Sequence, residues 1–293
     1  MNAAPGSSTT PDASQPIEPP HPWPLLSLAA LTVLELSPRD QVHCAAQAGY
    51  DHVGLRLVPA TPDEPAWDSV GDTALMRATR KALDDTGLRV LDIEVLRLKP
   101  HTRAGDFARV LETAAMLSAR YLLIAGNDPE ESRMADNLAQ LCELARPLRL
   151  FACVEPMPWT DVRDIGQALR VVERTGADNA GVLIDAIHFD RADSRPEQLA
   201  DIPPARLPYM QLCDAPARRP GTIEAVVQQS RSARLRPGEG GLDLRGLLAA
   251  MPPGVPLSLE VPLAERARMP ALERARSVLE ATRRFLGRSD ASR

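Results

Sequence analysis

Four apolar runs of the sequence end in a side chain that carries an oxygen donor. The donors are Glu155, Asp185, Gln211 and Glu260. If the runs are parallel strands of one barrel, their carboxyl ends meet at the barrel's top, where such barrels carry out their chemistry. Three carboxylates and one amide oxygen make a hard ligand set that suits Mg²⁺, Mn²⁺ or Co²⁺. The sequence therefore predicts one divalent metal ion held by these four residues.

Alternation of side chains along each strand supports this interpretation. In the run 151–155, Glu155 and Cys153 share one face while Val154 lies on the other, because successive strand residues point to opposite sides. A barrel strand needs its apolar side under the helices, so Glu155 is expected to face the interior, as is Glu260 in the run 257–261. Each donor taken singly has an ordinary alternative as a helix cap, a salt-bridge partner or a solvated carboxylate. The inward placement of the whole set favours the metal site.

The elements that must position these donors follow an alternating pattern. From residue 25 onward, short apolar runs alternate with amphipathic stretches of helical length, which is typical of βα units around a parallel sheet. The predicted strands are 25–31, 52–58, 89–95, 121–125, 150–155, 181–185, 207–212 and 257–261. Ser37 is expected to cap the first helix and Gly49 to end it, and the sixth strand is expected to lead to a short helix at 196–200.

The count of units predicts the fold. Eight consecutive βα units fit a single α/β domain, a (β/α)8 TIM barrel over residues 25–287, with a tail at 288–293. The alternative is a doubly wound open sheet, which usually has a glycine-rich phosphate-binding turn after its first strand. The residues after that strand, Ala29 to Thr32, contain no glycine. The glycine-rich stretch 237–241 follows no strand directly and lacks the Lys-Ser/Thr of a phosphate-binding loop, so we predict a turn or lid there.

Composition limits the class of protein and its partners. The chain has 293 residues, a formal net charge of -5 and a pI of about 5.6, which argues against nucleic acid and anionic membranes as partners. The four cysteines are scattered without a CxxC pair, as expected for reduced thiols in a cytoplasmic protein. Residues 1–24 are rich in proline and serine and are predicted to form a disordered arm. We expect no membrane span and no signal peptide.

Five short motifs occur in a fixed order along the chain. They are Glu155-Pro156, the D-x-x-H of 185–188, the QLCDAP of 211–216, the PGEG of 237–240 and the SLEV of 258–261. Together they resemble the xylose isomerase-like TIM-barrel superfamily, also called the sugar phosphate isomerase/epimerase family. The resemblance covers most of the chain from 25 to 286. It implies that the four oxygen donors bind one divalent metal and that His188 contacts the substrate.

The resemblance also implies a class of reaction. It points to a metal-dependent isomerase or epimerase that acts on a small polyhydroxylated carbonyl compound, a ketose or inosose, through an enediolate. Glu155 and Glu260 would move protons and His188 would bind or polarise a substrate oxygen. Tagatose epimerase-like and inosose-processing relatives typically have histidine at the position of Gln211, whereas 3-dehydroshikimate dehydratases include members with glutamine. A dehydratase-type lyase that uses the same metal site is therefore the alternative.

Other polar or aromatic residues near strand ends are predicted to line the substrate pocket. They are Arg56, Glu94, Arg97, Asn127, Trp159 and Arg218. Either Arg56 or Arg97 is suited to clamp a carboxylate or phosphate, and an ion pair between loops is the alternative for each. Trp159 is predicted to form an apolar wall, or to pack. Asp214 is expected to orient the metal ligands.

Two other classes of protein fit the sequence less well. Metal-dependent endonucleases that cut abasic DNA resemble this fold, but they need several metals and many histidines, and this chain has five histidines and an acidic balance. A non-catalytic binding protein that kept the barrel is disfavoured by the four retained oxygen donors. The predicted partner is thus a small molecule, and a homo-oligomer is left open.

Overall fold

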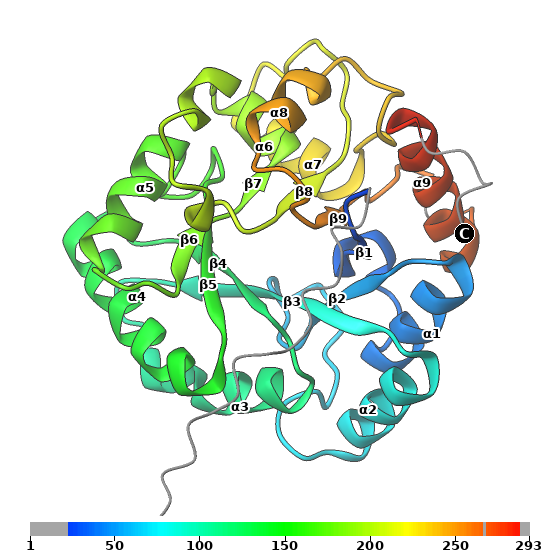
Figure 1. Ribbon diagram of the computed structural model, residues 1–293, viewed down its shortest axis with the longest axis horizontal. Coiled ribbons are helices and arrows are strands. Elements are labelled where there is room, and N and C mark those ends of the chain that lie inside the picture. Colours follow the sequence, from blue (N-terminus) through cyan, green and yellow to red (C-terminus); the bar gives the residue numbers. More distant parts are fainter. Residues whose placement is uncertain (1–22, 266–267, 288–293) are drawn as a thin grey trace, which may run out of the picture.

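The computed structural model describes residues 23–265 and 268–287. Nine parallel strands form one sheet in the order β6-β5-β4-β3-β2-β1-β9-β8-β7. The strands are β1 Leu26–Leu28, β2 His52–Arg56, β3 Arg89–Leu98, β4 Tyr121–Gly126, β5 Phe151–Glu155, β6 Ala180–Val182, β7 Ile184–Asp185, β8 Met210–Leu212 and β9 Leu257–Leu259. Figure 1 shows them at the centre of a ring of helices, so the predicted TIM barrel is confirmed. The predicted arm, 1–24, and tail, 288–293, lie almost wholly outside the described residues.

The sheet closes at Leu183, which separates β6 from β7. β6 pairs with β5, and β7 pairs with β8. Between them the Leu183 N–H donates to the carbonyl of Val154, 2.9 Å away. The predicted sixth strand, 181–185, is thus one extended run whose pairing passes from one neighbour to the other, and the two ends of the sheet are consecutive in the chain.

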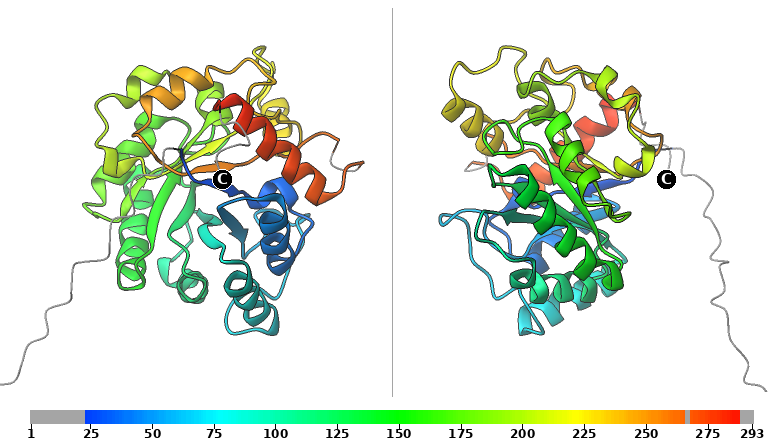
Figure 2. Two further views of the ribbon diagram at one scale, coloured as in Figure 1. Left: turned by 45° about the vertical axis from the view of Figure 1, so that its right-hand side comes forward. Right: turned by 90° about the vertical axis from the view of Figure 1, so that its left-hand side faces the viewer.

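Helices surround this barrel (Figure 2). They are α1 Pro38–Ala48, α2 Ala74–Thr86, α3 Ala108–Met116, α4 Glu131–Ala145, α5 Ile165–Arg174, α6 Ala186–Arg191, α7 Ile223–Ser232, α8 Leu244–Ala250 and α9 Ala271–Phe285. As predicted, Ser37 caps α1, its hydroxyl accepting from the Asp40 N–H, and Gly49 ends that helix at φ 93°. That positive φ favours glycine.

The structure corrects two predicted elements after the sixth and seventh strands. The segment predicted as a short helix at 196–200 is a 3₁₀ turn, η4 Pro196–Leu199, and the α-helix of this unit, α6, begins directly after Asp185. The long connection 214–241, for which only a turn or lid at 237–241 was predicted, also contains α7. No helix in the described ranges is long and apolar enough to cross a lipid bilayer.

Two apolar layers hold the barrel together. The larger one lies between the outward strand faces and the helices, and it includes Val53, Ile124 and Val154. A smaller cluster fills the barrel interior, where the rings of Tyr121 and Tyr209 stack 4.7 Å apart. This interior floor supports the polar residues that the strand ends present above it.

Candidate functional site

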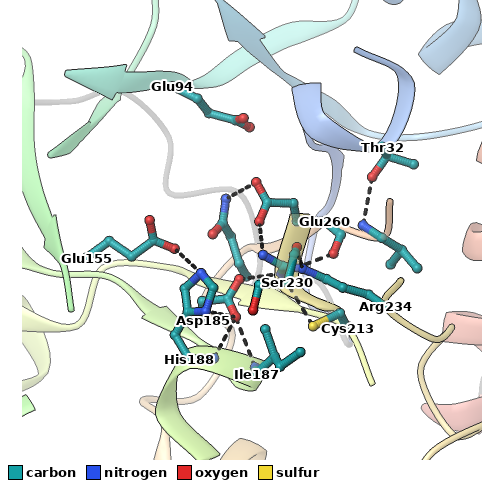
Figure 3. Close-up of polar contacts among 12 residues, drawn as sticks. Thr32, Glu94, Glu155, Asp185, Ile187, His188, Cys213, Ser230, Arg234 and Glu260 are labelled. Carbon is teal, nitrogen blue, oxygen red and sulfur yellow. Dashed lines mark hydrogen bonds and ion pairs between the residues drawn. The ribbon is translucent and has the colours of Figure 1, made fainter. Parts of the chain in front are cut away.

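The four predicted metal ligands converge in the structure. Glu155 ends β5, Asp185 ends β7, Gln211 lies within β8, and Glu260 directly follows β9. None of the four is more than 4 % exposed, and Figure 3 shows the three carboxylates pointing toward one another. Parallel strands bring these donors together because their carboxyl ends share one rim of the barrel.

The amide of Gln211 lies among the carboxylates. Its Nε2 donates to Glu260 Oε1 at 3.3 Å. With the amide turned over, its nitrogen would lie 2.9 Å from Glu155 Oε1 and 3.2 Å from Asp185 Oδ2. In the first orientation the amide oxygen faces two carboxylate oxygens, which a cation between them would stabilise, and in the second the amide nitrogen would donate to both.

His188 extends the donor set. Its Nε2 lies 3.6 Å from Glu155 Oε1 and its Nδ1 3.9 Å from Asp185 Oδ1. One ligand atom from each of these three side chains lies within 4.8 Å of the other two, an arrangement that suits a metal ion. The histidine is placed by the start of α6, where Asp185 Oδ1 accepts from the N–H groups of Ile187 and His188 at 2.9 and 3.2 Å.

Arg234 is a site residue that the sequence analysis missed. Its guanidinium lies 2.6 Å from Asp185 Oδ2 and 2.6 Å from Glu260 Oε2, and its side chain is 2 % exposed. The arginine also donates to the carbonyls of Ser230, at 2.7 Å, and Glu260, at 3.2 Å. The nearby glycine-rich stretch 237–241 indicated a loop, but it did not indicate which neighbouring arginine turns inward.

Burial and charge together set the protonation of the site. Burial, then Asp185 and Glu260, raises the pKa of Glu155 well above its usual value. Burial raises the pKa of Glu260 to about 7, although Arg234 acts in the opposite direction. Burial is the largest single effect on Asp185 and acts to raise its pKa, but Arg234, His188 and the hydrogen bonds to the carboxylate together outweigh burial and lower the pKa. Burial lowers the pKa of His188 to about 4, so its imidazole is neutral at pH 7.

A cavity of about 360 Å³ opens above these donors. Of the residues predicted to contact substrate, Arg56, Arg97, Trp159 and His188 line it, together with Glu155 and Glu260. The Trp159 and His188 rings meet edge to face with centroids 4.8 Å apart. Arg231, which was not predicted, joins the lining from α7.

The two predicted arginines differ in their partners. Arg56 makes ion pairs with Glu64, at 2.8 Å, and Glu94, at 3.3 Å. This arrangement agrees with the alternative prediction for Arg56, an ion pair within the protein. Arg97 donates to Asn127 Oδ1 at 3.0 Å and, weakly, to the Ala60 carbonyl at 3.4 Å. No carboxylate within the described ranges pairs with Arg97. Its guanidinium lines the cavity and has only neutral acceptors among the described residues.

Four predicted residues have other positions than expected. Asn127 does not line the cavity, and its side-chain oxygen accepts from Arg97. Glu94 is fully buried and does not line the cavity; its carboxylate accepts from the Ala30 N–H at 3.0 Å and pairs with Arg56. Arg218 lies on the exposed part of the connection 214–241, outside the cavity. Asp214 contacts no candidate ligand through its carboxylate, which instead accepts from backbone N–H groups at 238, 240 and 242. Arg218 and Asp214 belong to a long connection, which gives no periodicity from which their placements can be predicted.

Sequence comparison identifies the family. The sequence pattern described as xylose isomerase-like TIM barrel matches residues 42–285. This chain belongs to that family. The structure of an IOLI protein with a bound zinc atom superposes with a TM-score of 0.76 at 19 % identity, covering 90 % of this chain and 98 % of that one, which agrees in fold.

Two curated relatives carry different activities. The chain is 32 % identical over 201 residues to a 3-dehydroshikimate dehydratase of Pseudomonas aeruginosa, a match that covers 63 % of this chain and 31 % of that protein. It is 22 % identical over 234 residues to an inosose isomerase of Bacillus velezensis, covering 76 % and 81 % of the two chains. The chain thus spans about a third of the length of the dehydratase that it matches.

Proposed function

We propose that this chain is a divalent-metal-dependent enzyme that removes a proton next to a carbonyl group of a small polyhydroxylated substrate. The outcome that the site supports best is dehydration of a carboxylate-bearing cyclic substrate such as 3-dehydroshikimate. The observation that carries this proposal is the wall of the cavity, where Arg97 and Arg231 lie near the oxygen donors. Neither has a carboxylate partner in the part of the chain that the structure describes, and a substrate carboxylate would supply one.

The chain's own residues would supply the metal ligands, a substrate hydrogen bond and the base that removes the proton. Glu155, Asp185, Gln211 and Glu260 would hold the ion, and the neutral imidazole of His188 can join them or accept a substrate hydrogen bond. Bound there, a divalent ion would polarise the substrate carbonyl and stabilise negative charge on its oxygen. Glu155 or Glu260 would take the proton from the adjacent carbon, and the hydroxyl one carbon further would leave as water. Removal of one water from 3-dehydroshikimate gives protocatechuate.

The choice of metal follows from Gln211. Its amide oxygen is a harder and weaker ligand than the imidazole nitrogen found in ketose epimerases, so Mg²⁺, Mn²⁺ or Co²⁺ should serve better than Zn²⁺. The similarity to a 3-dehydroshikimate dehydratase also supports the lyase. The expected partner is a small molecule, with neither nucleic acid nor membrane involved.

Isomerisation or epimerisation of a ketose or inosose is the second candidate. The positions of the two glutamates favour this outcome. Glu260 Oε1 lies 3.3 Å from the Gln211 nitrogen, and Glu155 Oε1 lies near the other end of the same amide. With one glutamate on each side, one can remove a proton and the other can return it. The inosose isomerase relative supports this outcome.

Incubation of the metal-loaded protein with 3-dehydroshikimate tests the proposal. We expect protocatechuate, detected by its aromatic absorbance and by mass. Arg97→Ala and Arg231→Ala should each raise KM by about 10- to 100-fold, the loss of one charged hydrogen bond. The exposed Arg39→Ala of α1 is the control and should keep the wild-type KM. Exchange of a ketose or inosose C–H proton with solvent deuterium, without protocatechuate, would instead establish the isomerase.

A further inference from the structure

Asp214 has no place in the reaction described above, yet its carboxylate is buried beside the site. It is 2 % exposed and accepts four backbone hydrogen bonds. The donors are the N–H groups of Ala215, Gly238, Gly240 and Leu242, at 2.8, 3.0, 2.9 and 3.1 Å. Backbone donors satisfy a carboxylate fully without any cation, so this residue serves the loop and not the metal.

The backbone of Asp214 is joined to the same loop. Its N–H donates to the Leu235 carbonyl, and the Leu235 N–H donates back to its carbonyl, both at 2.8 Å, which forms an isolated antiparallel bridge. Leu235 directly follows Arg234, the arginine held between Asp185 and Glu260. The bridge therefore fixes the backbone at the residue next to Arg234, whose guanidinium reaches the site.

A close approach at Gly240 shows how tightly the carboxylate is enclosed. A Cβ atom on this residue would lie 2.3 Å from Asp214 Oδ1 and 2.3 Å from the Ala215 carbonyl. Any other residue would push the carboxylate away from the loop. This contact explains why residue 240 is a glycine, and no bound phosphate is needed to account for it.

We propose that Asp214 is a positioning residue that holds Arg234 between Asp185 and Glu260 by clamping the loop 235–242. The clamp is necessary because Arg234 comes from a connection of 28 residues, 214–241, whose closure costs conformational entropy. Misplacing a charged group at a reacting centre by about 1 Å can cost about 100-fold in rate. The inference rests on the proposed function only in its kinetic readout.

The first test is a double-mutant cycle on substrate turnover. Asp214→Asn replaces an oxygen acceptor by a nitrogen donor facing backbone N–H groups, and it should lower kcat/KM by about 10- to 100-fold. In the Arg234→Ala background the same change should cost less than about 2-fold, because the group that it positions is absent. Equal losses in both backgrounds would show that Asp214 acts independently of Arg234 and would overturn the inference.

A second test does not depend on substrate or on the folding of Arg234→Ala. Gly240→Ala leaves both charges in place but displaces the carboxylate, and Gly221→Ala, whose Cβ would meet no atom within 4 Å, is its control. Backbone amide exchange measured by mass spectrometry should rise for 235–242 in Gly240→Ala and Asp214→Asn, with exchange in α1 to α4 unchanged. If both variants exchange at 235–242 as slowly as the wild type, the proposed role of Asp214 is overturned. If the wild-type protein is inactive on every substrate tested, that result counts against the proposed function alone.

Discussion

The imidazole of His188 carries a pH-dependent part of the protein's stability. Burial lowers the pKa of this histidine from 6.5 to about 4. Between these two values the unfolded chain binds a proton that the folded chain does not, so the free energy of unfolding falls as the pH falls through this window. Above pH 6.5 both states are neutral and the contribution is fully present.

His188→Gln should therefore reduce the acid sensitivity of the metal-free protein. Between pH 8 and pH 5, wild type should lose about 2 kcal/mol more of its unfolding free energy than the variant does. Urea unfolding at both pH values measures the difference. His43→Gln, a change at a half-buried histidine of α1, should retain the wild-type loss, and an equal loss in His188→Gln would contradict the assigned environment.

Gln211 is expected to determine which metal the site prefers. Gln211→His replaces an amide by an imidazole in the same position between Glu155 and Glu260. The variant should bind Zn²⁺ at least about 10-fold more tightly relative to Mn²⁺ than wild type does, since nitrogen suits the softer ion. Competition between the two metals, followed by elemental analysis, measures the ratio. The exposed Gln228→His of α7 controls for adventitious zinc binding, and an unchanged ratio in Gln211→His would remove Gln211 from the ligand set.

Among the elements, β2 and β3 meet at a glycine that the buried carboxylates require. A Cβ on Gly54 would lie 2.5 Å from Asp92 Oδ1 and 2.8 Å from Glu94 Oε1. Burial, then Glu94, raises the pKa of Asp92 well above its usual value, and Tyr209 donates to its Oδ2 at 3.1 Å. A glycine inside a strand marks such a close approach.

Gly54→Ala should destabilise the protein by about 2 kcal/mol, the cost of forcing an extra carbon into a filled interior. The midpoint of urea unfolding measures this change. Gly105→Ala is the matched control, because a Cβ there meets no atom within 4 Å, and its midpoint should stay within the error of wild type. A wild-type midpoint for Gly54→Ala would mean that β3 can move away from β2 at no cost.

At the scale of the whole molecule, metal binding should stabilise the barrel, because the ion would be held by residues of β5, β7 and β8 and by the residue after β9. A ligand at 100 times its Kd adds about 2.7 kcal/mol to the unfolding free energy, which corresponds to a rise of roughly 5–10 °C in Tm for a chain somewhat smaller than this one. We expect EDTA to lower the Tm and Mn²⁺ to restore it.

Glu260→Gln should weaken this response, because it removes one charged ligand. Thermal unfolding with increasing Mn²⁺ should show the half-maximal rise in Tm at a concentration at least about 10-fold higher than in wild type. The exposed Glu143→Gln of α4 should respond as wild type does. Identical titrations for Glu260→Gln and wild type would exclude Glu260 from the metal site.

The sequence by itself determined the barrel and the rim of oxygen donors. Strand period and helix caps such as Ser37 are local signals, and a donor at the end of a parallel strand reaches the shared rim whatever the loops do. For this reason the placement of Glu155, Asp185, Gln211 and Glu260 followed from their positions in the chain. Which ion they bind, and whether all four bind it, stay predictions.

Only the tertiary structure decided what surrounds these donors. Arg234 enters the site and Arg218 from the same connection stays exposed, although both lie between Asp214 and Leu235, which pair with each other. Glu94, predicted to contact substrate, is fully buried and pairs with Arg56. Contacts across 21 to 49 residues carry no periodic trace in the sequence, since they depend on how a long loop closes and not on its local composition.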